Sequence, residues 1–255
     1  MVSVVCELLN NFHINNEIFI LQFLWKHDPP KAGQFFMIKP LRSSTFLPRP
    51  ISIFEFSKDK CILKFLISIR GKGTHELSLL QPGENVQLTG PIGNSWEKFL
   101  PETGRAALIG GSTGTAPLSA LVYEKPDYNF DFYAGFKKGF NDKSMENAFL
   151  GAAVNANKLI ISAEDGNSAH YGRIVDLLTE PEKFDIIFAC GPVAMLKIIK
   201  DKCDKKNVAC CLSMENIMAC GVGACLGCTI KTVNGNRCCC KDGPIFPAGE
   251  IIFDE

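Results

Sequence analysis

The stretch that decides the fold is Ala106-Ala107-Leu108-Ile109-Gly110-Gly111-Ser112-Thr113-Gly114-Thr115-Ala116-Pro117. Its first four residues predict a short buried strand, the glycines a tight turn, and the residues from Thr115 onward the start of a helix. Further along the chain we expect strands at 130–134, 158–162 and 185–190, and helices at 144–153, 174–178 and 193–202. Strands that alternate with helices at this spacing indicate a parallel sheet covered on both faces.

The glycine turn is also a candidate binding site. Glycines let backbone amides approach a pyrophosphate at a helix N-terminus, where the helix dipole favours an anion. On this motif alone, a turn that merely joins strand to helix is an equal alternative. A second turn ends another expected parallel strand, and ligands of open α/β sheets bind at that edge. The predicted nucleotide contacts are therefore Gly110, Gly111, Gly114, Cys190, Gly191 and Pro192, although Cys190 could be only a core thiol.

Residues 1 to about 100 have a different pattern. Short aromatic and β-branched runs separated by Gly and Pro predict an antiparallel barrel or sandwich. The runs lie at 19–25, 34–38, 51–56, 61–69 and 86–88, and one helical turn is expected at 74–80 with Thr74 as its cap. Arg49-Pro50-Ile51-Ser52 and Gly71-Lys72-Gly73-Thr74 could each be a plain turn. Together, an arginine fixed by proline and a glycine turn at a helix start favour binding of a flavin dinucleotide.

Cysteine usage is unusual, because the chain has 12 cysteines and eight of them lie between Cys210 and Cys240. Cys220, Cys225 and Cys228 have the C-x4-C-x2-C spacing of plant-type [2Fe–2S] proteins, with a fourth ligand expected further on. Zinc is the competing interpretation, but zinc usually prefers paired C-x2-4-C knuckles. A disulfide framework is disfavoured in a reducing cytoplasm. The sequence therefore predicts an iron–sulfur cluster.

Length, charge and hydropathy limit the other possibilities. A chain of 255 residues predicts about two domains, here with a small appendage. The 27 basic and 27 acidic residues cancel, which argues against nucleic-acid or membrane-surface partners. No run approaches 18 apolar residues, and residues 1–7 carry no basic segment of a signal peptide. We therefore expect a cytoplasmic protein with no transmembrane helix.

In their order along essentially the whole chain, these motifs resemble the ferredoxin–NADP reductase superfamily. The tail Cys240-Lys241-Asp242-Gly243-Pro244-Ile245-Phe246 is similar to that of the iron–sulfur flavoprotein subunit of type B dihydroorotate dehydrogenase, the PyrK family. The resemblance implies a multidomain α+β protein. Its parts would be an antiparallel β-barrel FAD domain at 1–101, an α/β parallel-sheet NAD domain at 102–207, and a small C-terminal [2Fe–2S] lobe at 208–255.

The resemblance also implies an activity. The chain would be an oxidoreductase subunit that passes electrons between NAD(H) and a partner through FAD and a [2Fe–2S] cluster. That partner would be an FMN-containing catalytic subunit that oxidises dihydroorotate to orotate in pyrimidine biosynthesis, in a heterotetramer of two plus two. No catalytic residue beyond the cofactors is then expected in this chain. The nearest alternative is the flavin subunit of a sulfhydrogenase or of an NADH-dependent ferredoxin–NADP oxidoreductase.

Residue roles follow from the same resemblance. Arg49 would bind the FAD pyrophosphate and Ser52 would face the flavin ring, with Pro50 and Ile51 completing that motif. Leu66, Ile67 and Ser68 would lie along the flavin through their backbone, and Gly73 and Thr74 would meet the phosphates. Two positions depart from the superfamily pattern: Ile51 stands where an aromatic residue is frequent, and Ser112 stands where a third glycine is usual.

The fourth cluster ligand and the choice between NADH and NADPH stay open at the level of sequence. The fourth cluster ligand would be Cys240 by the tail motif. If 238–240 is extended, Cys239 faces away and Cys238 shares the face of Cys240 as an alternative ligand. Lys137 and Lys138 could meet a 2′-phosphate or be plain surface, so NADH and NADPH are not distinguished. The apolar residues Ile217, Met218 and Leu226 predict a docking surface for the partner.

Overall fold

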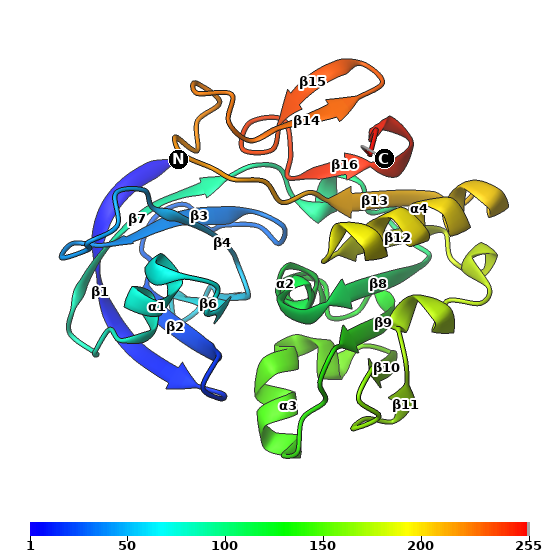
Figure 1. The fold of residues 1–255 in the computed structure, drawn as a ribbon, viewed down its shortest axis with the longest axis horizontal. Helices are drawn as coiled ribbons and strands as arrows, with labels where there is room; N and C mark the ends of the chain where they lie inside the picture. Colours follow the sequence, from blue (N-terminus) through cyan, green and yellow to red (C-terminus); the bar gives the residue numbers. More distant parts are fainter. Residues whose placement is uncertain (254–255) are drawn as a thin grey trace.

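The computed structural model describes residues 1–253, which form two seven-stranded sheets side by side and a small hairpin lobe above their junction (Figure 1). The first sheet is antiparallel throughout, in the order β4-β3-β7-β1-β2-β6-β5. Its strands are β1 (Val2–His13), β2 (Ile18–Leu24), β3 (Phe35–Pro40), β4 (Arg49–Ser52), β5 (Glu55–Ser57), β6 (Ile62–Ser68) and β7 (Asn85–Ile92). Strand β4 at one end contacts β6 near the other, so the sheet curls around a core that contains Phe23, Phe36 and Phe65. The expected antiparallel barrel is confirmed.

Two strands of this sheet differ from the prediction. The longest one, β1, was not among the expected runs, because only Cys6 and Leu8 of its side chains are buried and no clear apolar alternation marks it. A bulge between Leu8 and Asn10 lets its first half pair with β7 and its second half with β2. The run expected as one strand at 51–56 is instead divided, since β4 ends at Ser52 and β5 begins at Glu55.

Helix α1 (Lys72–Ser78) follows β6 and begins two residues earlier than expected. Gly71 is its N-cap, so the prediction that Thr74 caps the helix is wrong. Thr74 lies in the first turn, where its Oγ1 accepts hydrogen bonds from the backbone N–H groups of Arg70 at 2.8 Å and Gly71 at 3.3 Å. A side chain at the third helical position commonly reaches back to satisfy these amides.

The second sheet runs in the order β11-β10-β9-β8-β12-β13-β16 and is parallel except for β16. Its strands are β8 (Arg105–Gly111), β9 (Asn129–Phe136), β10 (Lys158–Ala163), β11 (His170–Tyr171), β12 (Ile186–Cys190), β13 (Ala209–Ser213) and β16 (Ile245–Pro247). The helices are α2 (Thr115–Glu124), α3 (Lys143–Leu150) and α4 (Val193–Lys206). Short 3-10 turns lie at 96–98, 112–114, 151–155, 174–177, 181–183 and 248–250, and the one at 174–177 replaces a helix expected there.

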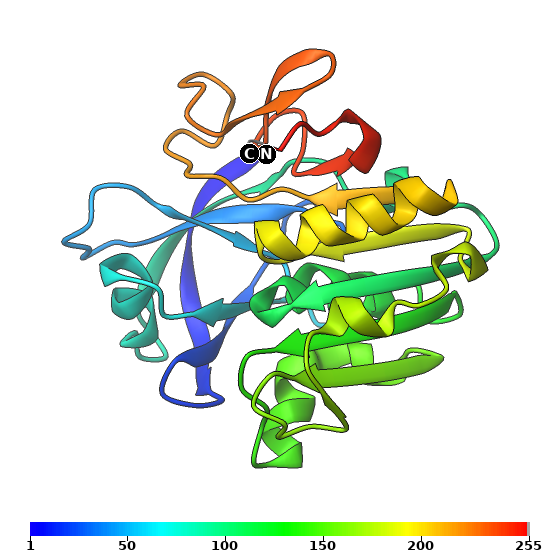
Figure 2. The ribbon, with the colours of Figure 1, turned by 45° about the vertical axis from the view of Figure 1, so that its right-hand side comes forward.

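Helices cover both faces of this sheet, as predicted (Figure 2). Side chains of β8 alternate between two cores: Leu108 packs in the cluster that includes α2 and α3, and Ile109 in the cluster that includes α4. Residues buried on both faces explain why β8 reads as a continuous apolar run. Trp96 is fully buried and donates its Nε1–H to the carbonyl oxygen of Pro117 at 3.0 Å, which joins the first domain to α2.

The lobe is inserted between two neighbouring strands of the second sheet. The boundary between the second domain and the lobe was expected at residue 208. Strand β13 lies after this boundary but belongs to the second sheet, where it runs parallel to β12. The chain then leaves at Ser213, forms the hairpin of β14 (Thr229–Thr232) and β15 (Gly235–Cys238), and returns as β16, with Ile245 opposite Ser213. Asn94, from the first domain, holds the returning chain through hydrogen bonds with Ile245 N–H at 3.0 Å and Ile245 C=O at 2.8 Å.

In the described part of the chain, no helix combines the length and the apolar character that crossing a bilayer requires.

Candidate functional site

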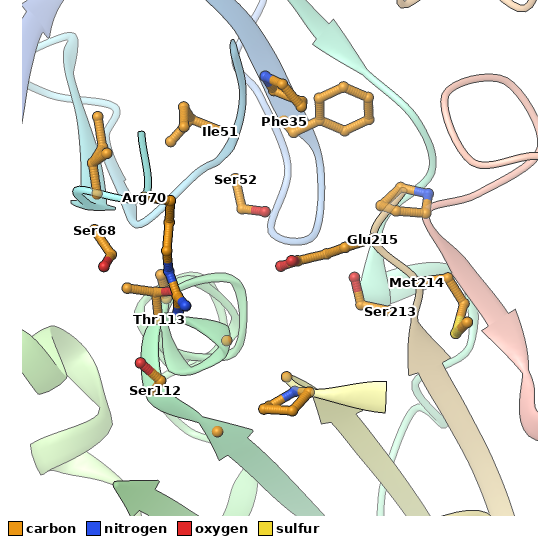
Figure 3. Close-up of a pocket in the computed structure, with 18 of the residues that line it drawn as sticks. Phe35, Ile51, Ser52, Ser68, Arg70, Ser112, Thr113, Ser213, Met214 and Glu215 are labelled. Carbon is orange, nitrogen blue, oxygen red and sulfur yellow. The ribbon is translucent and has the colours of Figure 1, made fainter. Parts of the chain in front are cut away.

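A cavity of about 620 Å³ lies where the two domains and the base of the lobe meet (Figure 3). A cavity of this size is in the range that holds a cofactor or small molecule. Strands β4 and β6 line it from the first domain, the turn before α2 from the second, and the segment after β13 from the lobe. The predicted site residues that line it are Arg49, Pro50, Ile51, Ser52, Leu66, Ile67, Ser68, Thr74, Gly111, Gly114, Gly191 and Pro192.

Three predicted residues lie behind this lining. Gly73 lies under the side chain of Arg49, and Gly110 packs against Thr115 at the base of the glycine turn. Cys190 is buried at the end of β12, and burial raises the pKa of its thiol. Cys190 therefore supports the turn as a neutral thiol.

Arg49 is positioned by the absence of a side chain at Gly73. A Cβ at Gly73 would come within 1.9 Å of Arg49 Nε and 2.4 Å of its Cζ. The guanidinium thus lies directly on the first turn of α1, beside Thr74. A cation and free helix amides in one place form an anion cradle, which fits a dinucleotide phosphate.

We therefore predict that Gly73→Ala displaces the Arg49 guanidinium and weakens FAD binding by roughly 10- to 100-fold, which is the loss of a charge-assisted hydrogen bond. The flexible arginine can move, so the melting temperature of the apoprotein should hardly change. Fluorescence titration with FAD measures the affinity. Gly71→Ala is the matched control, because its Cβ would meet nothing within 4 Å; equal FAD affinity in both variants would contradict the cradle.

The glycine turn approaches the second turn at the strand ends. A Cβ at Gly114 would come within 2.3 Å of the backbone oxygen of Cys190, so only glycine permits this contact. Ser112 adopts φ 52°, the left-handed conformation that glycine takes readily, so the turn keeps its shape at some cost in strain. The 3-10 turn 112–114 runs directly into α2, so the Thr115 N–H bonds to the carbonyl oxygens of Ser112 and Thr113, and the first amides without a side-chain cap are those of the turn itself.

The four predicted cluster ligands form two pairs of thiols. Cys228 and Cys240 are buried with their sulfurs 3.3 Å apart, and Gly223 donates its N–H to Cys240 Sγ at 3.1 Å. Cys220 and Cys225 form a more exposed pair, in which the N–H of Cys225 reaches Cys220 Sγ at 3.4 Å. Two pairs are the donor set that two iron atoms need. Among residues 1–253, no group of three or more His, Cys, Asp or Glu is placed to hold a single metal ion.

Backbone amides prepare the exposed pair for metal binding. The N–H groups of Val222 and Cys225 point at Cys220 Sγ and lower the pKa of this thiol to about 6. Burial and the neighbouring Cys228 raise the pKa of Cys240 to about 12, so a bound metal would have to displace its proton. The residues present fit a [2Fe–2S] cluster, with thiolate donors and amides directed at sulfur.

The segment 238–240 is not extended. Its side chains therefore do not alternate in the way that would place Cys238 and Cys240 on one face. β15 ends at Cys238, whose N–H donates to the Asp242 carboxylate at 2.8 Å, while its carbonyl accepts from the N–H of Asp242 at 2.8 Å. This turn directs Cys240 to Cys228, whereas Cys238 Sγ lies 3.8 Å from Thr229 Oγ1. The geometry favours Cys240 as the fourth ligand.

Relatives of known name cover nearly the whole chain. Residues 215–252 match the family model described as the iron–sulfur cluster binding domain of dihydroorotate dehydrogenase B. The dihydroorotate dehydrogenase B (NAD(+)) electron transfer subunit of Caldanaerobacter subterraneus subsp. tengcongensis is 34% identical over 252 residues, which are 97% of each chain. That of Clostridium acetobutylicum is 38% identical over 225 residues, 88% of this chain and 87% of the relative.

The chain belongs to the family of dihydroorotate dehydrogenase B electron transfer subunits.

Solved structures of differently named proteins share the fold of this electron transfer subunit. An NADH-dependent reduced ferredoxin–NADP oxidoreductase superposes with a TM-score of 0.83 at 23% identity, over 98% of this chain and 90% of the other. A ferredoxin NADP⁺ reductase from Neisseria gonorrhoeae, with FAD and NADP bound, has a TM-score of 0.66 at 15% identity, over 80% and 91%. At these identities the likeness concerns the fold alone.

Sequence reasoning missed about half of the cavity. The further lining residues are Phe35, Arg70, Ser112, Thr113, Ala116, Val193, Leu196, Ser213, Met214, Glu215, Asn216, Met218 and Pro244. The lining residues that follow β13 belong to the part of the sequence expected to form the cluster lobe, and no motif marks them as cavity residues. In Figure 3 the Glu215 side chain extends into the cavity, where the surrounding protein raises the pKa of its carboxyl and the charge of Arg70 partly opposes that shift. In an electron transfer subunit, a segment shared by the cavity and the cysteine lobe links the two sites directly.

Proposed function

We propose that this chain transfers electrons between NAD(H) and the catalytic subunit of dihydroorotate dehydrogenase B, in the oxidation of dihydroorotate to orotate for pyrimidine biosynthesis. One observation carries the proposal. The phosphate cradle of the first domain and the glycine turn of the second line one cavity, and the segment after β13, which also lines this cavity, reaches Cys220 within a few residues. The 34% identity over 97% of a named electron transfer subunit supports it.

The residues divide among three groups. Arg49, Ser52, Gly73 and Thr74 would hold FAD with the backbone of 66–68; the turns at 110–114 and 190–192 would hold NAD(H); and Cys220, Cys225, Cys228 and Cys240 would hold the cluster. When bound, FAD exchanges a hydride with the nicotinamide and single electrons with the cluster, which carries only one. We accordingly divide the chain by cofactor into 1–101, 102–207 and 208–255, with β13 and β16 seating the third part on the sheet of the second.

The role of this chain's own residues is to bind and orient the cofactors. Arg49 would bind a phosphate beside α1, the amides of the turn 112–114 would bind another, and the close approach of Gly114 to Cys190 brings the two turns together at the strand ends. The burial of Cys228 and Cys240 keeps water from one side of the cluster site. We assign the chemistry on dihydroorotate to a partner that carries FMN, in a cytoplasmic assembly of two plus two chains.

The alternative, a subunit of an NADH-dependent ferredoxin–NADP oxidoreductase or of a sulfhydrogenase, is less well supported. The chain is 23% identical in sequence to the NADH-dependent ferredoxin–NADP oxidoreductase, and at this identity the similarity concerns the fold. The relatives that match at 34–38% carry the dihydroorotate dehydrogenase B name.

The proposal predicts a coloured protein. After anaerobic reconstitution with iron, sulfide and FAD, the purified chain should show flavin and [2Fe–2S] absorption in the visible range, and NADH should bleach both. Dihydroorotate should reduce NAD⁺ only once the catalytic subunit is added. A colourless protein, or dihydroorotate oxidation by this chain alone, would refute the assignment.

A further inference from the structure

The cavity contains a cation with no assigned role. Arg70 lies between β6 and α1, and its backbone N–H is anchored on Thr74 Oγ1 at 2.8 Å. Its side chain lines the cavity and points toward Thr113, which belongs to the opposite domain (Figure 3). Within residues 1–253, no side-chain hydrogen bond of its guanidinium and no ion pair within 4 Å is found. Arg70 is thus held at its base and free at its charged end.

The guanidinium faces a second source of positive charge. Thr113 belongs to the 3-10 turn 112–114, whose first amides have no side-chain cap and which runs directly into the ten-residue helix α2. A helix N-terminus carries roughly half a unit of positive charge. Like charges that face one another across a cavity are unfavourable, and an anion between them reverses the sign of the interaction. Glu215 is the acidic residue in the lining; the charge of Arg70 acts on its carboxyl, but the two side chains form no ion pair within 4 Å.

The two arginines of the lining serve different places. Arg49 packs on Gly73 and is committed to the first turn of α1 inside the first domain. Arg70 instead points away from α1, toward the second domain. We propose that Arg70 binds the pyrophosphate of the pyridine nucleotide from the first domain, opposite the glycine turn, so that both domains hold the nucleotide. This inference rests on the proposed NAD(H)-dependent function.

Arginine suits this role because its planar fork can bind phosphate oxygens in a bidentate manner. The pyrophosphate does not react, so its contact with Arg70 contributes equally to the ground state and the transition state. Loss of such a contact raises KM and leaves kcat unchanged. A flavin pyrophosphate has the same chemistry, so the experiment must distinguish the two dinucleotides.

The test uses the FAD-loaded, cluster-loaded chain with Arg70→Ala, Arg70→Lys and the control Lys60→Ala, an exposed cation on the turn between β5 and β6. Calorimetric titration with ADP-ribose measures pyrophosphate binding without turnover. Reduction of an artificial acceptor is then followed with NADH and with 1-benzyl-1,4-dihydronicotinamide, a hydride donor without phosphate. FAD content per chain is measured for every variant.

We expect Arg70→Ala to weaken ADP-ribose binding and raise the KM for NADH by roughly 10- to 100-fold. Its kcat, its rate with the phosphate-free donor and its FAD content should stay unchanged, with Arg70→Lys intermediate and Lys60→Ala like the parent. Unchanged ADP-ribose affinity, or loss of FAD in its place, would overturn the Arg70 assignment alone. A parent protein that binds neither NADH nor ADP-ribose would overturn the proposed function as well.

Discussion

Cys240→Ala is expected to lose nearly all of its iron and sulfide while FAD stays bound. The sulfur of Cys240 lies 3.3 Å from Cys228 Sγ and accepts the Gly223 N–H at 3.1 Å, so one iron would lose half of its protein ligands. The phosphate cradle at Arg49 is built from residues of the first domain alone. Iron and sulfide analysis, with flavin content measured on the same sample, checks both halves of this expectation.

The neighbouring cysteines provide matched controls for that experiment. Cys239→Ala and Cys238→Ala should each keep a full cluster, because the turn closed by Asp242 directs Cys238 to Thr229 and gives neither cysteine a sulfur contact with Cys228 like that of Cys240. All three substitutions remove one buried sulfur, so a general loss of packing would affect them alike. If Cys238→Ala loses the iron and Cys240→Ala keeps it, the ligand assignment is in error by two residues.

The second large effect concerns the partner. Ile217→Asp combined with Leu226→Asp should abolish copurification with the catalytic subunit and the dihydroorotate-dependent reduction of NAD⁺. Ile217 precedes the cysteine loop, residues 220–228, and Leu226 lies within it. Their side chains are 82% and 63% exposed, whereas Met218, expected in the same surface, is buried and lines the cavity. Central apolar contacts are worth about 2 kcal/mol or more each, so the pair should weaken binding roughly a thousandfold.

Val233→Asp is the control for this surface. Val233 is 62% exposed on the same lobe, but it lies in the turn of the β14–β15 hairpin, which projects away from the cysteine loop (Figure 1). Pull-down with the catalytic subunit gives the affinity, and visible spectra verify that flavin and cluster remain. Retention of the partner by the double variant, or its loss with Val233→Asp, would place the interface elsewhere.

Strong local signals in the sequence identified the architecture. The strand, glycine turn and helix of 106–117 are found as predicted, because a strand buried on both faces and a helix that starts after glycines are specified by neighbouring residues. Strand β1 was not predicted because most of its side chains are exposed and give no apolar pattern. Its pairing with β7 and β2 makes this segment a strand.

The cavity was less predictable than the fold. Arg70 and Glu215 belong to no motif, and they reach the same space only because two domains and a lobe meet there. The turn at 238–242 depends on reciprocal hydrogen bonds between Cys238 and Asp242, which spacing alone does not reveal. Contacts between distant segments therefore account for most of what sequence reasoning missed.

The way the lobe is seated bears on how electron flow can be regulated. Its two ends leave and rejoin the second sheet on strands that are hydrogen-bonded to each other, and Asn94 fixes the returning chain to the first domain. A lobe on a single linker could swing and so gate transfer mechanically, in the manner of a hinge. Three points of attachment oppose such motion, so the gap between the cysteine loop and the cavity is a constant of the fold. The rate of electron transfer would then depend on the redox state of the cofactors and on whether the partner is bound, rather than on a change of conformation.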